Sequence, residues 1–347
     1  MSERDDLLTS VANTIRTYRE GDLPEPTPEH VDRWLRQFTI EQQLPFLREF
    51  NHVLKQCFLT REVTERCLAN FLTAEALTGS DPAAYWSSAN FLNIQQNGQS
   101  QKEMLNLFTI CLKEKYDLDI HSCGKPSGDF IYLDDVMFSG NRVGNDLGPW
   151  ITDQAPQSAK VNVILVALHL GGSYFIEKKL QGLAKEAGKE ITITFWRILA
   201  IENRKHNKNS SSVLWPATIP STPEVQAYLA EPSKFPFEPR ESAAQTTWPF
   251  SSEAGRQVLE SEFLIAGTKI RAMCEDPKPS MRPLGFSPFG VGFGSTIVTY
   301  RNCPNNCPLA LWWGDPDATS GALHWYPLLA REVYSSLRNI FDDFKTI

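Results

Sequence analysis

Hydrophobic residues are spaced differently in the first part of the chain and in its middle. In residues 1–75 apolar side chains recur at intervals of three and four, which predicts a helical N-terminal extension. Farther along, apolar runs of strand length alternate with helical segments, and these runs are 91–94, 130–133, 161–167 and 191–201. Alternating strands and helices favour a mostly parallel sheet with both faces covered, so the pattern predicts an α/β fold.

The alternation stops after Glu202. Residues 202–250 contain a polar run, 204–208, and seven prolines, which is typical of an irregular insertion or lid. A helix near 252–273 and a short strand at 296–300 are expected next, and apolar spacing predicts a closing helix over Leu328–Phe344. We therefore expect an extension over 1–75 and one larger domain over 76–347.

The amino-acid composition limits the classes of function that the protein can have. The chain of 347 residues has 34 Lys and Arg against 41 Asp and Glu, which argues against a broad basic surface for nucleic acid. The chain starts without a cationic and apolar signal, and the longest apolar run, 161–170, is much shorter than the ~20 residues of a membrane span. Seven cysteines without repeated spacing favour reduced thiols, so we expect a cytoplasmic protein without a membrane partner.

Two adjacent acids, Asp134 and Asp135, follow the apolar run 130–133. If the strand ends there, both carboxylates lie at the carboxyl edge of the sheet, where open α/β sheets bind ligands. Carboxylates accept hydrogen bonds from sugar hydroxyls and, together with waters, hold Mg²⁺. The alternative is that these acids only cap the helix that follows.

A turn with phosphate-binding character comes next, made of Ser139, Gly140, Asn141 and Arg142. Such a turn directs backbone amides at one point, and the guanidinium adds a charged contact. In the alternative interpretation Gly140 simply serves the turn.

The stretch 130–142 resembles the phosphoribosyl-pyrophosphate loop of type I phosphoribosyltransferases, in which two acids and a Thr-Gly-Gly-Thr-like loop follow an apolar strand. The chain departs from that pattern with Asn141 in place of the second glycine and Arg142 in place of the final hydroxyl residue. The resemblance implies that Asp134 and Asp135 hold the ribose hydroxyls, directly or through Mg²⁺. It also implies that residues 139–142 grip the 5′-phosphate.

Residues 95–100 lie between a predicted strand and a predicted helix, and by position they are similar to the pyrophosphate loop of the same enzymes. The residues concerned are Asn97, Gly98, Gln99 and Ser100. Amides at the start of a helix and the Ser100 hydroxyl suit a diphosphate. The alternative is an ordinary turn in which Ser100 caps the helix, within a capping box that ends at Glu103.

Further segments are similar to the PRTase-CE group, phosphoribosyltransferase-like proteins of bacterial conflict systems, some of them encoded beside retron reverse transcriptases. These segments are 31–38, 290–295, 299–308 and the pair Trp312-Trp313. Within them, Asn305 and Asn306 offer amides for a base or ribose, and Trp312 offers a ring for stacking. The equally weighted alternative is a turn and core tryptophans.

Together these resemblances imply a phosphoribosyltransferase-like effector of bacterial anti-phage defence that binds phosphoribosyl pyrophosphate or a nucleotide with Mg²⁺. It would transfer or cleave at the anomeric carbon of ribose, although the sequence leaves open whether the chain is an enzyme. The alternative is a non-catalytic nucleotide-sensing or scaffolding subunit. A retron reverse transcriptase and its DNA–RNA product are the implied partners. Outside the loops, His169 is expected to be a buried structural histidine.

Overall fold

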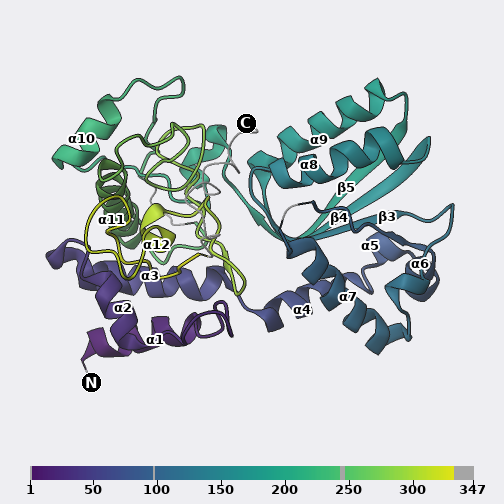
Figure 1. Cartoon of the computed structure of the whole chain (residues 1–347), viewed down its shortest axis with the longest axis horizontal. Coiled ribbons are helices and arrows are strands. Elements are labelled where there is room, and N and C mark those ends of the chain that lie inside the picture. Colours follow the sequence, from purple (N-terminus) through teal and green to yellow (C-terminus); the bar gives the residue numbers. More distant parts are fainter. Residues whose placement is uncertain (1, 97, 243–246, 332–347) are drawn as a thin grey trace. The chain divides into compact units, whose positions relative to one another are not determined.

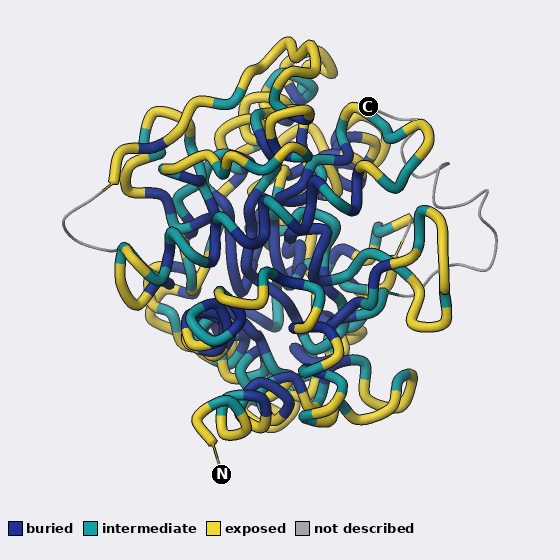
Figure 2. Tube along the Cα trace, turned by 90° about the vertical axis from the view of Figure 1, so that its left-hand side faces the viewer, coloured by how far each residue is buried: buried dark blue, intermediate teal, exposed yellow. Residues whose placement is uncertain are grey.

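The computed structural model describes residues 2–96, 98–242 and 247–331, and they form two compact units (Figure 1). Unit 2 is the continuous segment Thr60–Ser211, whereas unit 1 combines the residues up to Leu59 with those from Ser212 onward. In the trace, buried residues are concentrated in interior segments and exposed residues in peripheral helices and loops (Figure 2).

These units differ from the expected division at residue 75. Helix α4 (Arg61–Phe71) was assigned to the N-terminal extension, but it buries Leu68 and Phe71 in the same apolar cluster as Ile131 and Ile164 of the sheet. Periodicity identifies the apolar face of a helix but not the partner against which it packs.

Unit 2 is built on a four-stranded parallel sheet in the order β2-β3-β4-β5. Its strands are β2 (Asn90–Phe91), β3 (Phe130–Met137), β4 (Ser158–His169) and β5 (Glu190–Ile201). Phe130 lies opposite Val161, which lies opposite Ile193. The four apolar runs therefore form one sheet, which confirms the predicted α/β fold.

Helices cover both faces of this sheet (Figure 1). One face carries α8 (Asn141–Pro149) and α9 (Leu170–Glu186), and the other carries α4, α5 (Glu75–Thr78), α6 (Pro82–Ser88) and α7 (Ser100–Tyr116). Short helical turns are η2 (Ile120–Ser122), the π-helical η3 (Trp150–Gln154) and η4 (Lys205–Ser210). Because alternate side chains point to opposite faces, Tyr132 joins the cluster with α8 and α9, whereas Ile131 joins the other.

The regular elements of unit 1 are mostly helices, which long irregular segments connect. Its elements are α1 (Glu3–Thr14), α2 (Pro28–Leu35), η1 (Ile40–Gln42), α3 (Gln43–Cys57), α10 (Pro223–Ala230), α11 (Glu253–Ala272) and α12 (Leu309–Trp312), with a parallel pair of β1 (Phe58–Leu59) and β6 (Val298–Thr299). Its core contains clustered aromatic rings, among them Trp34, whose centroid lies 4.9 Å from that of Phe50. The helices predicted in residues 1–59 are therefore present.

The described parts of the segment expected to be irregular, 202–242 and 247–250, are largely irregular apart from η4 and α10. The expected helix after it is α11, which Ser252 caps by accepting a hydrogen bond from the Gly255 amide at 3.0 Å. Residues 328–331 are not helical, and the rest of the closing helix predicted over Leu328–Phe344 lies outside the described residues. None of the helices in the described ranges is long and apolar enough to span a bilayer.

Two glycines fix how the start of α9 packs on the turn after β3. A Cβ atom on Gly172 would lie 2.0 Å from the Phe138 carbonyl oxygen, and one on Gly140 would lie 2.9 Å from Cβ of Ile176. The backbone of α9 and the backbone of the turn are therefore in direct contact.

We predict that Gly172→Ala destabilises the protein by about 1–3 kcal/mol, because the added methyl group forces these two backbones apart. Gly182→Ala in the same helix is the matched control, since nothing lies within 4 Å of the added Cβ. The control is expected to stabilise by roughly 0.5–1 kcal/mol. Urea denaturation of both variants measures the difference, and an unchanged midpoint for Gly172→Ala would contradict the close packing.

Candidate functional site

The two adjacent acids lie inside β3, because the strand continues to Met137 instead of ending at Leu133. Pairing with β4 includes Asp134 and Val136 but omits Asp135. At this interruption the Asp135 amide donates to Oδ1 of Asp134 at 3.0 Å, and the Val136 amide donates to Oδ1 of Asp135 at 2.7 Å. Both carboxylates therefore accept hydrogen bonds from backbone amides in the second half of β3, where the pairing with β4 is interrupted at Asp135.

Asp134 is almost fully buried, with 2% of its surface exposed. Ser100 and Arg142 lie close enough to its carboxyl group to favour the charged form. Burial, helped by the neighbouring charge of Asp135, nevertheless raises the pKa of Asp134 to about 7. A carboxyl group with such a pKa at a sheet edge is a candidate functional group.

The turn after β3 is built around Gly140, whose φ of 82° lies in the left-handed region. The Asn141 amide donates to the Ser139 hydroxyl at 3.4 Å, and α8 begins at Asn141. Ser139, Asn141 and Arg142 are exposed. The first turn of α8 therefore presents backbone amides beside an exposed guanidinium.

Loop 95–100 lies against this turn. A Cβ atom on Gly98 would be 2.8 Å from Nη1 of Arg142, so the guanidinium packs on the glycine backbone. The structure thus brings together four predicted site residues, which are Gly98, Ser100, Asp134 and Arg142. Gln99 is exposed and precedes α7, whereas Asn97 lies outside the described residues.

The expected capping box at the start of α7 is wrong. Gln99, not Ser100, occupies the cap position, and its side chain makes no capping hydrogen bond. The Ser100 hydroxyl instead accepts from Nε2 of Gln95 at 3.1 Å. The contact with Gln95 therefore takes the hydroxyl that the expected box assigns to the helix end.

Sequence reasoning missed Asp146 on α8. Only 7% of this residue is exposed, and its Oδ2 accepts from the Tyr132 hydroxyl at 2.8 Å. Burial raises the pKa of Asp146, and the bond from Tyr132 opposes that shift. The sequence signal for this residue was an acid placed between Val143 and Leu147, on the apolar face of α8.

His169 is fully buried, and its Nδ1 lies 3.1 Å from the Met137 carbonyl oxygen. Burial lowers the pKa of the imidazole to about 4, so the ring is neutral at neutral pH. Its centroid lies 4.9 Å from that of Phe138, which places the ring against the turn after β3. This is the buried structural histidine that the sequence predicted.

The residues predicted to read a base or ribose belong to unit 1. Nδ2 of Asn306 donates to the Phe286 carbonyl at 3.2 Å, and the Phe286 amide donates to the Asn305 carbonyl at 2.7 Å. The Trp312 indole donates to the Cys307 carbonyl at 3.0 Å. These contacts join loops within unit 1, and the recognition role of the three residues stays a prediction.

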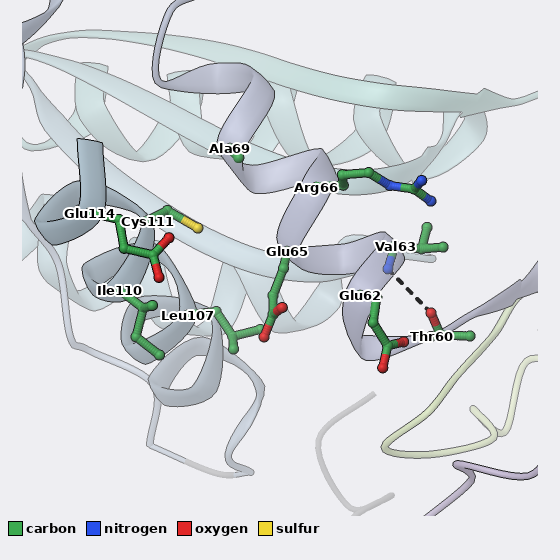
Figure 3. Close-up of a pocket in the computed structure, with 10 residues that line it drawn as sticks. All are labelled: Thr60, Glu62, Val63, Glu65, Arg66, Ala69, Leu107, Ile110, Cys111 and Glu114. Carbon is green, nitrogen blue, oxygen red and sulfur yellow. Dashed lines mark hydrogen bonds between the residues drawn. The ribbon is translucent and has the colours of Figure 1, made fainter.

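A separate cavity of 510 Å³ lies between α4 and α7 (Figure 3). Glu62, Glu65 and Glu114 give it an acidic lining, with Arg66 as the basic residue and the Cys111 thiol beside them. None of the predicted site residues lines this cavity. It is therefore distinct from the sheet edge at which the acids gather.

The parallel sheet, with two acids in the second half of β3 and a glycine turn leading into α8, is consistent with the phosphoribosyltransferase-like class of protein. The family model PRTase-CE matches residues 31–331. The chain therefore belongs to the PRTase-CE family, as its sequence resemblance indicated. No curated protein and no solved structure matches the chain.

We predict that Asp134→Asn stabilises the protein at pH 8 by about 1–3 kcal/mol, because it removes a buried negative charge. The pKa of Asp134 is raised above its ordinary value, so the cost of ionising it is full above about pH 7 and disappears toward pH 4. The gain should therefore fall to less than half at pH 5. Thermal denaturation from pH 5 to 8 measures it, with exposed Asp317→Asn as the control.

A gain that does not depend on pH, or a loss of stability at pH 8, would contradict the raised pKa.

Proposed function

We propose that the end of β3 in unit 2 binds phosphoribosyl pyrophosphate or a nucleotide, and that the protein acts at the anomeric carbon of ribose. In this proposal it is a cytoplasmic effector of bacterial anti-phage defence. The observation that carries the ligand assignment is the burial of the Asp134 carboxyl group near the carboxyl end of β3, with Ser100 and Arg142 close enough to act on it. A ribose hydroxyl is a donor of the kind that this carboxylate accepts.

Two groups of backbone amides support the placement of the phosphates. The first turn of α8, beside exposed Arg142, suits the 5′-phosphate, because amides and positive charge converge there. The glycine-containing loop 95–100 leads into α7, a helix of 17 residues whose amino end favours a second anion. In the proposed reaction, pyrophosphate bound at this loop would be the leaving group at the anomeric carbon of ribose.

The residues present fit Mg²⁺ bound largely by ligand and water. This ion commonly uses one or two carboxylates together with substrate phosphates and several waters. Asp134 and Asp135 supply two carboxylates, and burial raises the pKa of Asp134, which a bound cation would lower again. No group of three or more His, Cys, Asp or Glu side chains is gathered for a metal within the described ranges. When bound, Mg²⁺ would neutralise charge on the departing pyrophosphate.

A non-catalytic nucleotide sensor is the second candidate. It is favoured by the contacts of Ser100 with Asp134 and of Gly98 with Arg142, since a ligand that displaces them changes the structure of the loop. In this case a partner, such as a retron reverse transcriptase with its DNA–RNA product, would respond to the changed loop.

Calorimetric titration with phosphoribosyl pyrophosphate and Mg²⁺ tests the ligand assignment. The wild type is expected to bind, and Asp134→Asn/Asp135→Asn should weaken binding at least 10-fold, or about 1.4 kcal/mol, because neutral amides bind hydroxyls and Mg²⁺ less strongly. The exposed pair in unit 1, Asp315→Asn/Asp317→Asn, is the matched control and should leave affinity unchanged.

Equal affinity of the wild type and the Asp134/Asp135 variant would contradict the assignment of the acids, and no binding by the wild type would overturn the proposed ligand. Release of pyrophosphate during incubation indicates an enzyme, whereas binding without release supports the sensor.

A further inference from the structure

We infer that copies of this protein associate head to tail, with the exposed face of α9 of one copy seated in the cavity between α4 and α7 of the next copy. In this contact the rings of Tyr174 and Phe175 enter the cavity, while Lys178 and Lys185 face its glutamates. The inference does not depend on the proposed ligand, because none of the predicted site residues lines this cavity.

The cavity is formed by matching faces of two helices in unit 2 (Figure 3). On each helix, four lining residues follow the spacing i, i+3, i+4 and i+7, so they occupy one face. They are at positions 62, 65, 66 and 69 of α4 and at positions 107, 110, 111 and 114 of α7. Two such faces side by side form a groove of the kind into which a third helix packs.

The lining combines an apolar floor with negative charge. Leu107 is buried in the floor, whereas Ile110 keeps 48% of its surface exposed. Three glutamates and one arginine supply the charged groups. Burial raises the pKa of the Cys111 thiol, and the charges of Glu114 and Glu65 add to that shift, so both acids act on the same place. A fitting occupant therefore presents apolar or aromatic groups together with positive charge.

The exposed face of α9 has this chemistry. The helix buries every fourth residue along the side that packs on the sheet, and Tyr174, Lys178 and Lys185 are exposed on the opposite side. Tyr174 and Phe175 are 62% and 64% exposed, and their ring centroids are 5.6 Å apart. Exposed aromatic rings next to lysines mark an interaction surface that suits an acidic, apolar partner.

Gly182 lies on the same exposed side of α9, between the two lysines. None of the described residues has an atom within 4 Å of a Cβ placed on it, so no contact inside the chain calls for a glycine there. A glycine inside a helix costs roughly 0.5–1 kcal/mol relative to alanine. Between Lys178 and Lys185 the missing side chain lets the backbone of α9 approach a neighbouring helix closely.

The occupant is a second copy because the two complementary surfaces lie on opposite faces of one sheet. In unit 2, α9 packs on one face of the sheet and α4 and α7 pack on the other (Figure 1). One copy therefore cannot fill its own cavity, and each copy offers one cavity and one complementary helix. Contacts of this heterologous kind extend into an open chain or close into a ring.

Sedimentation velocity of the full chain measures the association. The wild type should form larger species as its concentration rises, and high salt should dissociate them, because salt screens the charges. Reversing the acids in Glu65→Lys/Glu114→Lys, or the lysines in Lys178→Glu/Lys185→Glu, should weaken the association at least about 10-fold.

Each reversed variant has a control with the same change in net charge. Glu75→Lys/Asp153→Lys replaces exposed acids of unit 2 that do not line the cavity, and Lys125→Glu/Lys160→Glu replaces exposed lysines outside α9. Both controls should associate like the wild type. A wild type that stays monomeric at low salt, or reversed variants that associate as it does, would overturn the inference.

Mixing the two reversed variants tests whether these two surfaces are each other's partners. Each variant keeps one unchanged surface, and its reversed surface is complementary in charge to the reversed surface of the other variant. The mixture should therefore recover the larger species that neither variant forms alone. A mixture that stays dissociated would overturn the pairing of α9 with the cavity.

Alkylation of Cys111 locates the contact. This partly exposed thiol lines the cavity, whereas Cys67, partly exposed on α4, does not. At high protein concentration Cys111 of the wild type should react at least about 5-fold more slowly relative to Cys67 than at low concentration, because the cavity is then filled. Lys178→Glu/Lys185→Glu should abolish this protection. Protection that persists in that variant, or is absent from the wild type, would overturn the inference.

Discussion

The burial of the Asp134 carboxyl group determines how the loops around the end of β3 are arranged. A charge that is almost fully buried needs compensation, which here comes from the Asp135 amide, at 3.0 Å from Oδ1 of Asp134, and from nearby Ser100 and Arg142. Part of the ionisation cost remains, as the raised pKa shows. The protein thus accepts a locally unfavourable group at the position where its proposed ligand binds, which is characteristic of functional sites.

Around the Asp134 carboxylate, the turn after β3 and loop 95–100 are held in different ways. The contact of Gly172 with the Phe138 backbone fixes the turn after β3, and neutral, buried His169 packs beside it. Loop 95–100, in contrast, is fixed by individual side chains such as Gln101, whose Oε1 accepts from the Ile94 and Gln95 amides at 2.8 and 2.9 Å. A site of this kind has one anchored half and one half whose geometry depends on a few replaceable hydrogen bonds.

The α/β fold could be predicted from the sequence because buried parallel strands leave continuous apolar runs, such as 161–167. That Asp134 and Arg142 lie close together could also be predicted, because a glycine turn follows the strand and brings the two residues near each other. The length of β3 was less predictable, because the two acids interrupt its apolar run although Val136 and Met137 continue the strand. The partners of Ser100 and Asp146 are tertiary contacts, which local spacing does not encode. For the same reason the spacing of apolar residues in α4 does not reveal that this helix packs on the sheet.

The order of the chain has a consequence for synthesis on the ribosome. Unit 2 is one uninterrupted segment, so all of it is available once Ser211 has left the exit tunnel. Unit 1 waits longer, because α3 packs on α11, which comes about 200 residues later in the chain. Until α11 has been synthesised, the aromatic side chains of α2 and α3 lack the helix against which they pack in the folded unit. A chaperone that binds exposed aromatic helices would therefore protect the beginning of this protein while its middle already folds.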